Sequence, residues 1–62
     1  MYAYPEKRKY PLNTRQQVHA AIAHFAANRR SYPPAVAAKI AARIRRAAKE
    51  RGIRIHSRKL EG

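Results

Sequence analysis

Basic side chains are the groups in this sequence best suited to bind a partner. Fifteen Lys and Arg residues stand against three acids, which gives a net charge of +12 at neutral pH. A cationic row on one side of a helix can neutralise successive backbone phosphates of a nucleic acid. The sequence predicts such a row between residues 33 and 51: Lys39, Arg43, Arg46 and Lys49. Basic residues elsewhere extend the predicted footprint: Lys7, Arg8, Lys9, Arg29 and Arg30.

Groups suited to catalysis or metal binding are sparse. The acids Glu6, Glu50 and Glu61 are too scattered for the paired carboxylates that glycoside hydrolysis needs. His19 and His24 fall on different sides of a helix and lack metal-ligand spacing. Neither serine has a base nearby in the sequence, and there is no Gly-rich phosphate loop. We therefore expect no enzyme, no metal site and no cofactor.

The excess positive charge points to a polyanionic partner. A charge of +12 on so short a chain disfavours the compact state unless a polyanion compensates it. We expect nucleic acid, with double-stranded DNA ahead of RNA. The helical row contains no Asn or Gln, so only arginine on guanine could read bases, and specificity should be low.

Besides a structural role inside a virion or a larger assembly, three alternatives to nucleic-acid binding are open. In the first, the chain is a protein-interaction module whose basic face binds an acidic protein. In the second, the charge serves solubility alone. A membrane surface is the least favoured partner, because the apolar side of the second helix is mostly alanine.

Length and apolar content limit the fold. Sixty-two residues form one domain, and a domain of this size buries only ~60% of the surface that its unfolded chain exposes. No cysteine is available for a disulfide. No apolar run approaches the ~18 residues of a membrane span, and the N-terminus lacks the apolar core of a signal peptide. These features predict a cytoplasmic protein.

A cap and a periodic apolar face mark the first helix, which is predicted at about residues 14–27. Thr14 followed by Gln17 forms a capping box, and Asn28 can adopt the left-handed conformation that ends a helix. The buried face has apolar residues at the i, i+3, i+4 and i+7 positions: Val18, Ala21, Ile22 and Phe25.

The second helix is predicted at about residues 33–51. Pro33 and Pro34 suit its first turn, and Gly52 suits the position after its end. Its apolar face is rich in alanine around Ile40 and Ile44, and such small side chains predict a close approach to the first helix.

These patterns predict an all-α fold, a helix–extended loop–helix domain with an extended basic N-terminal arm and a short extended C-terminal tail. The predicted division is residues 1–9 for the arm, 10–56 for the helical domain and 57–62 for the tail. SAP and LEM modules have an analogous architecture, which is an analogy of fold alone. A helix-turn-helix is less favoured, because the connection is long and carries prolines and no third helix follows.

The segment YPEKRKYP, residues 4–11, is predicted to fall partly in the arm and partly in the folded domain. Leu12 can staple the chain onto the first helix, and Tyr10 can cover Phe25. Pro11 is expected to hold Tyr10 in an extended conformation. Residues 1–9 have no comparable anchor and are expected to act as a phosphate-gripping arm. Three tyrosines are candidates for stacking on exposed bases or for covering the core: Tyr2, Tyr4 and Tyr32.

Three motifs together resemble a known family. They are the YPEKRKYPL opening, an alanine-rich helix with an aromatic residue near its end, and the ARIRRAAKERGI segment. Over roughly residues 4–56 they resemble small uncharacterised domains of bacteriophage and actinobacterial proteins. The most specific parts are Glu6 to Pro11, Ala47-Ala48-Lys49 and Gly52-Ile53.

This resemblance implies a phage context, and therefore the bacterial host cytosol, but it implies no mechanism. Arg29, Arg30 and the proline pair stand where the family commonly has an acidic segment. A function of the acidic relatives therefore need not carry over.

Overall fold

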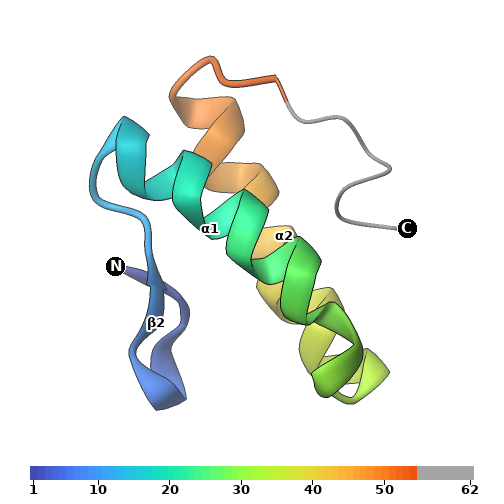
Figure 1. The fold of residues 1–62 in the computed structure, drawn as a ribbon. Helices are drawn as coiled ribbons and strands as arrows, with labels where there is room; N and C mark the ends of the chain where they lie inside the picture. The colour runs from blue at the N-terminus through green and yellow to red at the C-terminus, as the bar shows by residue number, and fades with distance from the viewer. Residues whose placement is uncertain (55–62) are drawn as a thin grey trace.

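The arrangement of residues 1–54 comes from a computed structural model, which describes this part of the chain. It is mostly helical, with these elements in order: β1 (Tyr2–Tyr4), the 3₁₀ turn η1 (Pro5–Lys7), β2 (Lys9–Pro11), α1 (Arg15–Asn28), the 3₁₀ turn η2 (Arg29–Ser31) and α2 (Pro34–Glu50). The two helices run side by side in opposite directions, and the hairpin of β1 and β2 lies next to them (Figure 1). β2 packs on α1 and β1 packs on α2, so the hairpin closes the core that the helices share.

Helix α1 begins at its predicted cap. The backbone N–H of Gln17 donates to Oγ1 of Thr14 at 3.0 Å, and the N–H of Thr14 donates to Oε1 of Gln17 at 3.2 Å. The two bonds satisfy N–H groups that the helix itself leaves without partners. The predicted apolar face is confirmed, since all four of its residues are buried.

Helix α2 also follows the prediction, to within one residue at each end. It begins with Pro34 in its first turn and ends before Gly52, whose φ of +68° is left-handed. The N–H of Ile53 then donates to the carbonyl of Ala48 at 2.8 Å, and the Ile53 side chain is buried. This hydrogen bond and apolar contact form the C-terminal helix cap that a left-handed glycine favours.

The N-terminal segment forms a hairpin, which corrects the predicted all-α fold with an extended arm. β1 and β2 pair antiparallel, with Tyr2 opposite Pro11 and Tyr4 opposite Lys9. Ala3 is fully buried. The charged run, residues 6–9, supplies the reversal between the strands and the first residue of β2, and its side chains are exposed while the strands pack on the helices. Charge in this run is therefore no obstacle to anchoring the strands.

The tyrosines of three Tyr-Pro dipeptides, at residues 4–5, 10–11 and 32–33, form one aromatic cluster with Phe25. The ring of Tyr10 meets Phe25 edge-on with centroids 6.0 Å apart, which confirms that Tyr10 covers Phe25. Tyr32 stacks on Phe25 at 6.1 Å, and Tyr4 meets Tyr32 edge-on at 5.6 Å. Edge-on and offset arrangements of this kind are favourable for aromatic rings. The tyrosines of the repeated dipeptide therefore pack against the core, whereas Pro5 and Pro33 are exposed.

The backbone of Tyr10 differs from its prediction. Its φ is +59°, in the left-handed region, whereas the proline after it predicts an extended conformation. A bulky residue rarely adopts this conformation, and the cost is of order 1–3 kcal/mol. Two contacts compensate, the ring contact with Phe25 and a 2.9 Å hydrogen bond between the hydroxyls of Tyr10 and Tyr32.

Two arginines tie the start of α1 to the end of α2. Nη1 of Arg15 donates to the carbonyl of Arg51 at 2.8 Å. Nη2 of Arg51 donates in turn to the carbonyls of Asn13 at 2.7 Å and Leu12 at 3.2 Å. Leu12 itself is buried, as predicted. These two cations therefore serve the fold.

Two further predictions concern the ends of the chain and the membrane. The predicted tail at 57–62, and the last two residues of the predicted domain, lie outside the described residues. Within residues 1–54, no helix combines the length and the apolar character needed to cross a bilayer.

Candidate nucleic-acid interface

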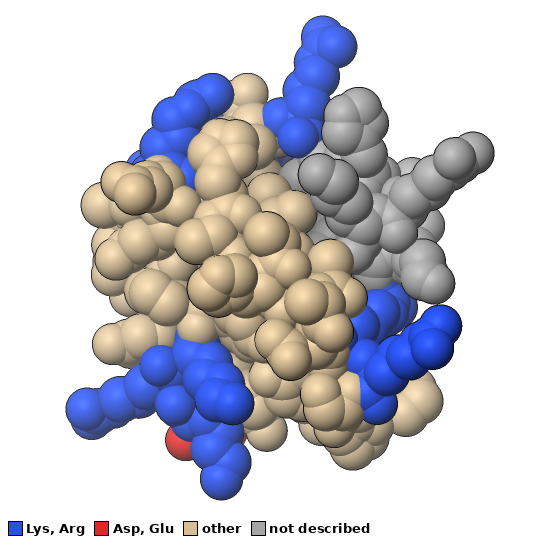
Figure 2. Space-filling view, viewed as in Figure 1, with Lys and Arg blue, Asp and Glu red and all other residues tan. Residues whose placement is uncertain are grey.

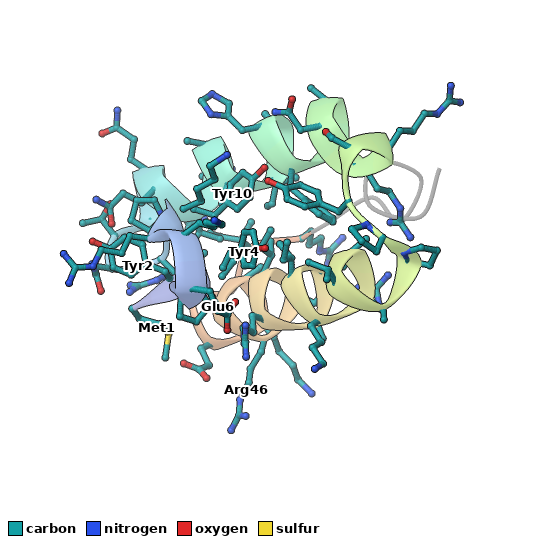
Figure 3. All side chains as sticks on the ribbon, turned by 90° about the horizontal axis from the view of Figure 1, so that it is seen from below. Met1, Tyr2, Tyr4, Glu6, Tyr10 and Arg46 are labelled. Carbon is teal, nitrogen blue, oxygen red and sulfur yellow. The ribbon has the colours of Figure 1, made fainter. Side chains whose placement is uncertain are left out.

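Three of the predicted cations form a row on the outer side of α2. Lys39, Arg43 and Arg46 are exposed and follow one another at i, i+4 and i+7, which places them on one helical face. Figure 3 shows Arg46 projecting from α2 on the side away from α1. The row (Lys39, Arg43, Arg46) therefore borders solvent on the outer side of the helix pair.

The hairpin holds one member of this row in place. Nη1 of Arg43 donates a hydrogen bond of 3.1 Å to the carbonyl of Ala3. Arg46 is freer, with 85% of its side chain exposed and Nε 3.6 Å from a carboxylate oxygen of Glu50. Such an exposed pair contributes little to stability, so a phosphate can compete for Arg46.

Two grooves run between the hairpin and α2 beside the row. The larger, of about 600 Å³, is lined by Met1, Tyr2, Pro5, Arg43, Arg46, Ala47 and Glu50. The smaller, of about 300 Å³, is lined by Tyr4, Glu6, Val36, Lys39, Ile40 and Arg43. Because Arg43 borders both, the grooves are neighbours along the same edge of the molecule.

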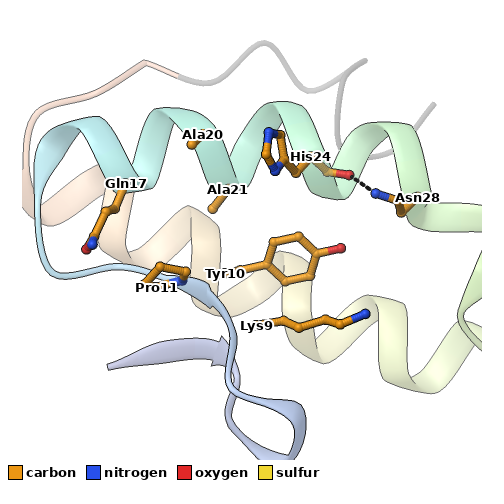
Figure 4. Close-up of a pocket in the computed structure, with 8 residues that line it drawn as sticks. All are labelled: Lys9, Tyr10, Pro11, Gln17, Ala20, Ala21, His24 and Asn28. Atoms are coloured by element: carbon orange, nitrogen blue, oxygen red, sulfur yellow. Dashed lines mark hydrogen bonds between the residues drawn. The ribbon is translucent and has the colours of Figure 1, made fainter.

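The basic side chains of the hairpin lie in two different places. Lys7 and Arg8 are exposed at the reversal between the strands. Lys9 instead lines a third groove, of about 410 Å³, between β2 and α1 (Figure 4). In that groove the ring of Tyr10 lies below α1, and Nδ2 of Asn28 donates to the carbonyl of His24 at 2.8 Å. Lys9 is therefore separated from the row on α2.

Of the other three predicted residues, Arg29 and Arg30 lie away from the row. Arg29 packs against the core, with its guanidinium carbon 6.0 Å from the ring centroid of Phe25. Its Nη1 is buried and makes no hydrogen bond within the described part of the chain. Arg30 is exposed on η2, at the opposite end of α1 from the capping box. Lys49 is exposed on α2 three residues after Arg46, so it adjoins the end of the row.

The exposed side of α1 contrasts with that of α2. The sequence has no Lys or Arg from Gln16 to Asn28. Viewed from this side, Lys and Arg project from the margins of the molecule, and the centre of the face carries none (Figure 2). A polyanion is therefore attracted to the edges and to the α2 side.

The phenol of Tyr10 is a titratable group with a shifted pKa. Burial raises the pKa of Tyr10 to about 12, and the hydrogen bond with Tyr32 adds to the increase. The phenol is therefore protonated at neutral pH and is no general base. Within residues 1–54, no three His, Asp or Glu side chains gather as a metal site.

Comparison with known sequences supplies a family. Residues 1–58 match a family of unknown function (DUF6582). The chain belongs to this family. No curated protein and no solved structure matches the chain.

In this member of DUF6582, two features of the site are beyond what the sequence predicts. The first is that Arg43 is anchored to the carbonyl of Ala3, which depends on the docking of β1. The second is which of the tyrosines is exposed to solvent. Tyr2 is 36% exposed beside the row, whereas Tyr4 and Tyr32 are partly buried in the aromatic cluster. The Tyr-Ala-Tyr alternation around the buried Ala3 was the available signal for a strand.

Proposed function

We propose that this domain is a non-catalytic nucleic-acid-binding protein that holds duplex DNA through its phosphates, with low sequence specificity. The observation that carries the proposal is the row of Lys39, Arg43 and Arg46 on the outer side of α2. Lys7 and Arg8 at the hairpin reversal extend it. The net charge of +12 supports the proposal, because a compensating polyanion would relieve the self-repulsion.

Low specificity follows from the side chains in the row. Two arginines and one lysine form strong charge-assisted bonds to phosphate oxygens. Asn and Gln, which read adenine, are absent from the row, so only arginine on guanine remains for base recognition. Phosphate contacts fix the position of a protein on DNA without distinguishing sequences.

The salt dependence of DNA binding tests the proposal. If the row and the hairpin reversal contact five phosphates, log K should fall against log salt with a slope of about −4.5, at ~0.9 per phosphate. Fluorescence anisotropy of a labelled random-sequence duplex measures this slope. A flat salt response, or no binding at low salt, would contradict the proposal and favour an acidic protein as the partner.

Single substitutions with the same charge change locate the contact. Lys39→Gln and Arg46→Gln should each lower the magnitude of the slope by about 0.9. Arg54→Gln is the matched control, since Arg54 is exposed beyond the end of α2 and outside the row. It should leave the slope unchanged. Equal losses from all three variants would mean that net charge, and not the row, determines binding.

A further inference from the structure

We infer that the larger groove between β1 and α2 is a subsite for one unpaired nucleotide, with its base on Tyr2 and its phosphate on Arg43 and Arg46. The preferred substrate is then nucleic acid that carries a single-stranded segment beside a duplex. This inference rests on the proposed function and adds to it the class of nucleic acid.

The aromatic wall of the groove is available for stacking. Of the four tyrosines, Tyr4, Tyr10 and Tyr32 belong to the partly buried shell of the core. Tyr2 is 36% exposed, and its neighbour Met1 is 76% exposed. Figure 3 shows both at the edge of the hairpin, beside α2 and not between the helices. The groove is therefore apolar on its hairpin side.

The opposite wall of the groove is cationic. Arg43 is held there by its hydrogen bond to the carbonyl of Ala3, the residue next to Tyr2. A guanidinium fixed in this way loses little further freedom when it binds a phosphate. Glu50 stands one turn beyond Arg46 and repels a phosphate at that end of the groove. The phosphate therefore has its place between Arg43 and Arg46.

This combination of walls distinguishes unpaired from paired bases. An aromatic side chain can stack only on a base whose face is uncovered, and in the interior of a duplex the neighbouring base pairs cover both faces. The volume of about 600 Å³ is in the range of sites for small ligands. Stacking on one aromatic ring raises the affinity for an unpaired base by about 5- to 150-fold.

The experiment compares a blunt duplex with the same duplex carrying a short single-stranded thymidine overhang. Anisotropy gives the two affinities, and 2-aminopurine in the overhang reports stacking by its quenched fluorescence. The wild-type protein should bind the overhang DNA at least about 5-fold more tightly. Tyr2→Ala should abolish this difference and the quenching, with no change in the slope for the blunt duplex. Tyr2→Phe, which keeps the ring, should retain both.

The outcomes separate the inference from the proposed function. Equal binding of both DNAs by the wild type, with a steep salt slope, overturns the subsite and leaves the proposed function standing. Binding of neither DNA overturns both. If Tyr2→Ala fails to fold by circular dichroism, Tyr2→Leu replaces it, since leucine keeps an apolar side chain without a π face. A preference for the overhang that survives in Tyr2→Leu would also overturn the subsite.

Discussion

Replacing Phe25 with alanine should remove most of the stability of the fold. Phe25 is fully buried, and its ring contacts those of Tyr10 and Tyr32. Truncation of a buried phenylalanine costs about 3–5 kcal/mol, because transfer free energy is lost and a cavity remains. At about 0.05–0.15 kcal/mol per residue, a chain of 62 residues has a total stability of about 3–9 kcal/mol. The expected loss is therefore comparable with the whole free energy of unfolding.

Urea denaturation at 25 °C measures this loss. Far-UV circular dichroism follows the helices, and tyrosine fluorescence follows the aromatic cluster, since the chain contains no tryptophan. With a urea dependence of about 1 kcal/mol per molar for so small a domain, a loss of 3 kcal/mol lowers the midpoint by about 3 M. Phe25→Leu is the control. It keeps an apolar side chain of similar size, so its midpoint should fall less.

A small effect would refute this reasoning. If Phe25→Ala shifts the midpoint by less than about 1 M at unchanged slope, Phe25 is not the centre of the core. The contacts of the Tyr10 and Tyr32 rings with Phe25 would then contribute little. A changed slope would instead indicate a different unfolded state or an intermediate, and the midpoint alone would no longer measure the contact.

Two other predictions follow from the hairpin and the aromatic cluster. Deletion of residues 1–9 should unfold the domain by circular dichroism, because it removes buried Ala3 and the Tyr4 ring; a nearly unchanged melting temperature would show that β1 is dispensable. Because burial and the bond to Tyr32 raise the pKa of Tyr10 from 10.0 to about 12, the folded state holds this proton more tightly. The corresponding stability is complete below pH 10 and is lost as the pH rises to 12. Absorbance of tyrosinate should show a late-titrating component that Tyr10→Phe removes, and its absence from the wild type would contradict the burial.

The helices were largely predictable because their signals are local, although Asn28 at the end of α1 has a φ of −107° and not the predicted left-handed conformation. The reciprocal bonds of Thr14 and Gln17 depend on residues three apart, and the closure at Gly52 depends on the glycine itself. The apolar spacing then determines which side of each helix is buried. These relations hold in any helix, so no knowledge of the rest of the fold was needed.

The hairpin was not predictable by the same rules. Its reversal uses Arg8 with φ of +50°, and β2 contains Tyr10 with φ of +59°, although neither residue type favours that region. The sequence has no Asn-Gly or Asp-Gly signal at this place. Tertiary contacts compensate for the unfavourable backbone, and these contacts form only when β1 and β2 meet the helices. Local propensity therefore gave the wrong result.

The candidate site was predictable only where helical spacing determines it. Lys39, Arg43 and Arg46 share a face by their spacing alone. Arg29 looks equivalent to them in sequence, yet it packs on Phe25 because η2 returns the chain over the aromatic ring. Whether a cation faces solvent or the core depends on its neighbours in space, which charge counting does not reveal.

The hairpin has a consequence for function as well as for stability. A free arm could contribute charge and be removed without harm to the rest of the molecule. The hairpin instead presents the carbonyl of Ala3 to Arg43 and holds Tyr2 beside the same groove. Because Ala3 is also fully buried, the strand that stabilises the core is the strand that orients the proposed interface. The neutral side of α1 leaves the α2 side and the hairpin as the direction from which a polyanion approaches. Binding and folding should therefore be coupled, so that DNA raises the melting temperature, and the increase should continue with the logarithm of the free DNA concentration above the dissociation constant.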